Sequence, residues 1–161
     1  MKRSASLAAL ALLVSGVGRA KADFIVDQQQ TVQNYGTGSA PYSIGQSFTP
    51  TATLMDTVEF TLFSQGSTSL QLAILDGVVG TDGLGGTVLG TSVPVTLTNS
   101  TLAPIDFQLT SPLSVVPGNT YVAELIFQGG ASIDWAQAGN LYPGGQMLQA
   151  PLSASDRKSV V

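Results

Sequence analysis

Apolar and polar residues alternate along several short segments of this chain. Segments 57–63 (TVEFTLF), 69–75 (SLQLAIL) and 105–109 (IDFQL) place apolar residues at nearly every second position. A period of two is that of a β-strand with one face on a core and the other towards water. Segment 120–128 is apolar at both parities, which predicts a central strand that is covered on both sides.

Turn residues separate these segments and set the expected fold. Asp76-Gly77 follows the second segment directly, and Pro117-Gly118 precedes the last one. Short strands with turn signals between them predict an all-β protein, an antiparallel β-sandwich of jelly-roll or other Greek-key type. We expect the Gly-rich segment 77–90 to be the most open loop. We expect eight or nine strands, at 24–28, 44–49, 54–63, 69–75, 87–98 (one strand or two), 104–109, 120–128 and 131–136.

The N-terminus has the three parts of a secretory signal peptide. Lys2 and Arg3 are basic, eight apolar residues follow from Leu7 to Val14, and Ala20-Lys21-Ala22 matches a cleavage site. Eight apolar residues are too few to span a bilayer, which takes about 20. We therefore expect export and cleavage after Ala22, with no membrane-spanning segment in the mature chain. The predicted organisation is a signal peptide at 1–22, a β-sandwich domain at 23–149 and a disordered tail at 150–161.

Charge is distributed unevenly along the sequence. The chain contains six Lys or Arg and ten Asp or Glu, which gives a net charge of −4. Four of the six basic residues lie in the predicted signal peptide. Its removal leaves two basic against ten acidic residues, a balance of −8, with no basic residue between Ala22 and Asp156. Such a chain repels phosphate backbones, so we expect no nucleic-acid partner.

The sequence contains no His and no Cys. Their absence excludes a His-based triad, thiol chemistry, disulfides and Cys/His zinc sites. A pair of carboxylates, as in glycoside hydrolases, is the catalytic arrangement that the remaining ionisable residues could form. Four acids are candidates for such a pair: Glu59, Asp106, Glu124 and Asp134. We expect Glu59 and Asp106 to lie instead on solvent faces of strands, and we expect no catalysis.

Calcium is a candidate metal ion for this composition, because it takes oxygen ligands only. Asp76 and Asp82, with the loop carbonyls between them, form a candidate structural calcium site, and Asp23 with Asp27 is another. The competing interpretation is that Asp-Gly at 76–77 and 82–83 is ordinary turn chemistry.

The only Trp lies in a segment whose composition suits sugar binding. Sugars stack on aromatic rings while carboxylates and amides accept their hydroxyls, and Asp134, Trp135, Asn140 and Tyr142 offer these groups. They form a candidate carbohydrate platform. The competing interpretation, which we favour from sequence, is that Trp135 packs against the edge of the core.

The order of these motifs resembles a known family. Gln46-Ser47-Phe48-Thr49-Pro50 is followed by TVEFTL and LQLAILDG, then by LSVVPGNTYVAEL at 113–125 and NLYPGG at 140–145. This order resembles the jelly-roll-like domains of secreted bacterial surface proteins, many of which carry a PEP-CTERM sorting tail. The resemblance implies export and a role at the cell surface or in a biofilm matrix, with no defined activity or site residues. Residues 150–161 lack the Pro-Glu-Pro, apolar helix and basic cluster of that tail.

These observations lead to three functional expectations. The first is a secreted, non-catalytic bacterial β-sandwich protein at the cell surface or in the extracellular matrix, whose partner is a neutral glycan, an exopolysaccharide or another surface protein. The alternative is a carbohydrate-binding module that uses Trp135 and Tyr142 as its platform. The third is a small glycan-active enzyme with a carboxylate pair.

Overall fold

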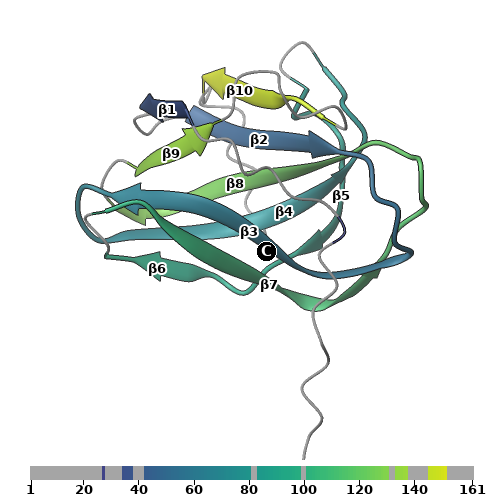
Figure 1. Cartoon of the computed structure of the whole chain (residues 1–161), viewed down its shortest axis with the longest axis horizontal. Helices are drawn as coiled ribbons and strands as arrows, with labels where there is room; N and C mark the ends of the chain where they lie inside the picture. The colour runs from purple at the N-terminus through teal and green to yellow at the C-terminus, as the bar shows by residue number, and fades with distance from the viewer. Residues whose placement is uncertain are drawn as a thin grey trace, which may run out of the picture.

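The computed structural model describes residues 27, 34–37, 42–80, 83–98, 101–130, 133–137 and 145–151. Within these ranges the chain is all-β (Figure 1). No helix long and apolar enough to cross a membrane occurs in this part of the chain. The strands are β1 (Asn34–Thr37), β2 (Tyr42–Phe48), β3 (Leu54–Ser64), β4 (Thr68–Asp76), β5 (Thr87–Thr91), β6 (Val95–Leu97), β7 (Ala103–Ser114), β8 (Tyr121–Gly130), β9 (Ile133–Gln137) and β10 (Met147–Pro151).

The strands form two sheets. The four-stranded sheet has the order β1-β9-β3-β7, and the six-stranded sheet has the order β10-β2-β8-β4-β5, with β6 also paired to β4. All pairings between named strands are antiparallel. The pairs β2/β10, β3/β9 and β4/β8 are nested in the sequence, as when one long hairpin is wrapped across two layers. This is the antiparallel, jelly-roll-like β-sandwich that the sequence predicts.

Strands β2 to β9 overlap the segments expected from the sequence, and the segment 87–98 forms two strands, β5 and β6. β7 continues to Ser114, past the expected end at 109. Strands β1 and β10 are not predicted, and β10 extends past the expected domain boundary at 149. Both are short edge strands without clear alternation, so only their pairing with β9 and β2 defines them. The first expected strand, 24–28, lies outside the described residues except for Asp27.

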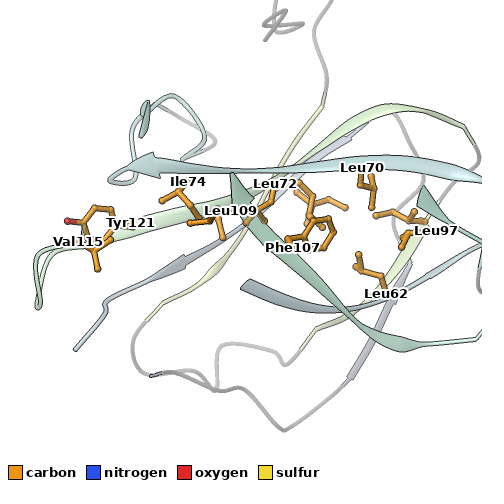
Figure 2. Packing of buried hydrophobic residues seen from close by; sticks show 13 residues of the cluster. Leu62, Leu70, Leu72, Ile74, Leu97, Phe107, Leu109, Val115 and Tyr121 are labelled. Carbon is orange, nitrogen blue, oxygen red and sulfur yellow. The ribbon is translucent and has the colours of Figure 1, made fainter. Parts of the chain in front are cut away.

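One hydrophobic cluster fills the space between the sheets (Figure 2). The four-stranded sheet contributes Leu62 and Phe107, and Phe107 meets Phe60 edge to face with ring centroids 6.2 Å apart. The six-stranded sheet contributes Leu72 and Leu125, both fully buried. Alternate residues of β3 and β4 therefore face the core, as their period of two predicts.

A second, smaller cluster lies on the opposite face of the six-stranded sheet. Leu84, from the loop between β4 and β5, packs there with Ala73, Leu75, Val122 and Leu148. The loop is thus only partly open: Val78 and Val79 are exposed, but Leu84 is buried. Leu84 contacts the sheet beside Gly45, a strand position that carries no side chain. The expectation that 77–90 is the most open segment stays a prediction, because residues 81 and 82 lie outside the described residues.

The connection from β7 to β8 crosses between the sheets and is held by hydrogen bonds. The hydroxyl of Tyr121, at the start of β8, accepts the backbone N–H of Val116 at 2.9 Å. Val115 N–H donates to the Thr53 carbonyl at 3.0 Å, and Gly118 N–H donates to the Pro50 carbonyl at 3.0 Å. A buried tyrosine that bonds back to such a corner fixes the path of the chain between two layers.

Candidate functional site

Polar side chains gather on the outer face of the four-stranded sheet, where β3 and β7 run side by side (Figure 1). Cross-strand partners share a face, and the core-facing Val58 pairs with Phe107. The alternate positions therefore point away from the core. We call these positions the β3–β7 outer face: Thr57, Glu59, Thr61 and Phe63 on β3, with Pro104, Asp106 and Gln108 on β7. Phe63 lies past the part of β3 that pairs with β7, and its cross-strand partner is Asp134 of β9.

Glu59 and Asp106 are direct cross-strand partners on this face. Directly opposite residues have Cβ atoms about 5 Å apart, and like charges in this position are destabilising. Both side chains are exposed, which confirms their expected solvent-facing positions. No basic residue occurs between Ala22 and Asp156, so this stretch of sequence supplies no cation to balance the pair. Carboxylates accept hydrogen bonds, so the pair suits a cation or a ligand whose hydroxyl groups donate hydrogen bonds.

Gln108 is held in place beside the acid pair. Its Oε1 accepts the Thr57 hydroxyl at 3.3 Å, and its Nε2 donates to the Asp56 carbonyl at 2.9 Å. Gln108 also stands two positions along β7 from Asp106, on the same face. The amide is therefore positioned next to the carboxylates by contacts within the sheet.

Phe63 is an aromatic residue at a position where β3 otherwise carries polar side chains. It is half-buried and belongs to neither hydrophobic cluster of the described residues. It lies four residues from Glu59, about 13 Å along the strand. Sequence reasoning missed Phe63, although the parity of Thr57, Glu59 and Thr61 extends directly to it.

The predicted carbohydrate platform is only partly within the described residues. Asp134 and Trp135 lie on β9, where Asp134 pairs with Phe63 and Trp135 pairs with Leu62. The register thus puts Asp134 on the same side of the sheet as Phe63, and Trp135 at a position that shares the side of the fully buried Leu62. Asn140 and Tyr142 lie outside the described residues. The platform as a group stays a prediction.

Two further acids of the sequence analysis, Glu124 and Asp76, lie apart from this face. Glu124 is on β8 of the six-stranded sheet, opposite Ala73. Asp76 is exposed at the end of β4, opposite Thr87, while its proposed calcium partner Asp82 lies outside the described residues. Among the side chains that the structure describes, none form a group of three or more acids suited to hold a metal ion. The calcium site at Asp76 and Asp82 therefore stays a prediction.

Asp27 has a structural role that the sequence does not signal. Its carboxylate accepts the Thr51 hydroxyl, the Thr51 N–H at 2.9 Å and the Ala52 N–H at 3.2 Å. The hydrogen bond from the Thr51 hydroxyl, helped by the two backbone donors, holds the pKa of Asp27 below its ordinary value. Because Asp27 and Thr51 are far apart in the sequence, no local pattern predicts the contact. Of the pair Asp23 and Asp27, Asp23 lies outside the described residues.

Comparison with known proteins adds no family to these observations. No protein-family model matches the chain, and no curated protein is similar to it at a significant level.

Proposed function

We propose that this protein is an exported, non-catalytic β-sandwich module that acts by binding at the cell surface or in the extracellular matrix. The observation that carries the proposal is the β3–β7 outer face. It presents Glu59, Asp106 and Phe63 on the surface of a sheet, where they are available to an extended partner. A glycosidase instead places its two carboxylates on either side of a single bond of the substrate.

One feature of the sequence supports an extracellular location. The segment 1–22 has the basic, apolar and small-residue parts of a secretory signal.

Expression of the full chain in a bacterial host tests the export step. We expect the purified protein to be recovered outside the cytoplasm with Asp23 as its first residue, as read by N-terminal sequencing. Substitution Ala22→Leu should block cleavage, because a large side chain does not fit the small-residue requirement of the cleavage site. Recovery of the parent chain in the cytoplasm with Met1 intact would overturn the proposal.

Neutral-glycan binding, the alternative in the sequence analysis, is favoured by one specific observation. Phe63 offers an aromatic ring on the face that also carries Glu59, Asp106 and the register position of Asp134. These are the group types that the platform hypothesis assigned to Trp135 and its neighbours.

A further inference from the structure

We propose that the contact of Asp27 with Thr51 closes the predicted signal-peptide cleavage site once the domain has folded, so that cleavage after Ala22 precedes folding. The inference rests on the proposed function, because it concerns the cleavage step of the same export process. It adds an order of events. The chain is cleaved while it is unfolded, and folding then ties the new N-terminus to the sandwich.

The Asp27 carboxylate attaches the start of the chain to the connection between β2 and β3. It accepts the Thr51 hydroxyl, the Thr51 N–H at 2.9 Å and the Ala52 N–H at 3.2 Å. A hydrogen bond to an ionised acceptor is about twice as strong as one between neutral groups. Three donors on one carboxylate therefore hold Asp27 at one place on the folded domain.

The connection that receives Asp27 is itself fixed by the corner between β7 and β8. The Pro50 carbonyl accepts the Gly118 N–H at 3.0 Å, and the Thr53 carbonyl accepts the Val115 N–H at 3.0 Å. These contacts flank the two residues that bind the carboxylate. The binding place is therefore complete only when the corner after β7 has reached it, so the anchor forms late in folding.

The predicted cleavage site lies close to this anchor along the chain. Ala22 and Asp23 flank the bond that is cut, and Asp23 is four residues before Asp27. Four residues span at most about 14 Å when fully extended. In the folded precursor the bond is thus tethered close to the sandwich by a short segment.

A protease needs a free, extended stretch of backbone on both sides of the bond that it cuts, so folded proteins are cut mostly through locally opened forms. The anchor shortens the stretch after the bond to the four residues 23–26. The side-chain balance of −8 also repels the folded domain from an anionic membrane surface, where a signal segment is held. Both effects slow the cleavage of a folded precursor, whereas an unfolded chain has no tether.

The test adds purified bacterial signal peptidase in detergent micelles to the full chain at increasing delays after its dilution from urea. Gels give the fraction cleaved, and N-terminal sequencing gives the site. Without delay we expect rapid cleavage that leaves Asp23 as the first residue. Once the circular dichroism spectrum is that of the folded protein, the rate should be lower by about tenfold or more, because the anchor must open first.

Two variants separate the anchor from folding itself. Asp27→Ala removes the acceptor, so its folded precursor should be cleaved about tenfold faster than the folded parent. Insertion of about eight Gly and Ser residues after Asp23 keeps the anchor but adds about 28 Å of reach, and it should also restore cleavage. The insertion provides a second measure if Asp27→Ala does not fold. Asp76→Asn, which changes an exposed acid at the end of β4, is the matched control and should resist cleavage as the parent does.

Equal cleavage rates for the folded parent and folded Asp27→Ala would contradict the inference. So would a parental rate that is independent of the delay, or an insertion variant that is as resistant as the folded parent. Absence of cleavage after Ala22 even without delay would instead contradict the proposed export step, and the inference with it. The two failures are distinguishable, because only the second one abolishes cleavage of the unfolded chain.

Discussion

The hydroxyl of Ser92 accepts the backbone N–H of Leu72 at 2.9 Å, at the point where the partner of β4 changes from β5 to β6. The Leu72 carbonyl in turn accepts the Ser92 N–H at 2.8 Å. Pro94 follows Ser92 by two residues and has no backbone N–H to donate to a neighbouring strand, which favours the break between β5 and β6. A fully buried serine side chain thus completes the hydrogen bonding of β4 across the break in its neighbour.

Substitution Ser92→Ala should lower the free energy of unfolding by about 1–3 kcal/mol, because it leaves the buried Leu72 N–H without its acceptor. Urea denaturation followed by circular dichroism measures the change. The control Ser111→Ala, at an exposed position of β7, should stay within about 0.5 kcal/mol of the parent. Equal effects of the two substitutions would contradict the role assigned to Ser92.

Tyr121→Phe should destabilise the protein by about 0.5–1.5 kcal/mol, since the ring is kept but the acceptor for the Val116 N–H is lost. Thermal unfolding at two or more protein concentrations measures the loss. Val116→Ala preserves the backbone donor and removes an exposed side chain, so it should leave the midpoint almost unchanged. A midpoint for Tyr121→Phe equal to that of the parent would show that the corner is held without this bond.

The contribution of Asp27 should depend on pH. Its pKa is lowered in the folded state from 3.8, so near that value the unfolded chain binds more protons than the folded one. The stabilisation is therefore complete above the unfolded value and is lost as the pH falls through the folded pKa. Melting temperatures of the parent and Asp27→Asn should differ at about pH 7 and converge by about pH 2.

Thr51→Val should show the same trend, because the Thr51 hydroxyl makes the largest contribution to the shift. A difference between parent and Asp27→Asn that stays constant from neutral to acid pH would rule out this linkage.

Glu59→Gln should stabilise the unliganded protein by about 0.2–1 kcal/mol, because it removes one of two like charges that face each other across β3 and β7. The gain should shrink as salt is added, since exposed charges are screened. Thermal melts at low and high salt measure it, with Asp76→Asn as the control. A loss of stability at low salt would mean that the pair is attractive, as through a bound cation.

Leu84→Ala should cost about 2–3 kcal/mol, because it uncovers Ala73, Leu75 and Val122 on the face of the six-stranded sheet. Val79→Ala, an exposed position of the same loop, is the matched control. Equilibrium urea unfolding separates the two. If both substitutions are neutral, the loop does not contribute packing to the sheet.

The alternation in the sequence was sufficient to predict the fold class and the faces of the central strands. The parity of 57–63 assigned Val58, Phe60 and Leu62 to one face, and the structure places them towards the core. Segment 120–128, apolar at both parities, is covered on both sides, with Leu125 in one cluster and Val122 in the other.

Contacts between distant segments were beyond sequence reasoning. The register that sets Glu59 opposite Asp106 depends on how β3 pairs with β7, and no local pattern specifies it. The contact of Asp27 with Thr51 is of the same kind. The carbohydrate platform shows a second limit of sequence reasoning. Asp134 and Trp135 were grouped by composition alone, whereas their register with Phe63 and Leu62 gives these neighbouring residues positions on opposite sides of the sheet.

The nested strand order has a consequence for how the chain acquires its structure. β2 pairs with β10, β3 pairs with β9 and β4 pairs with β8. Each of these early strands therefore has a partner that is synthesised much later. A chain that emerges from the ribosome N-terminus first has β2, β3 and β4 before their partners exist. Folding through such long-range pairings is slow, because the chain loses the entropy of closing a large loop before the contacts between the two strands compensate for that loss. We therefore expect the nested pairings to form only once the C-terminal strands are present, and a chain that ends before Met147 leaves one edge of β2 unpaired.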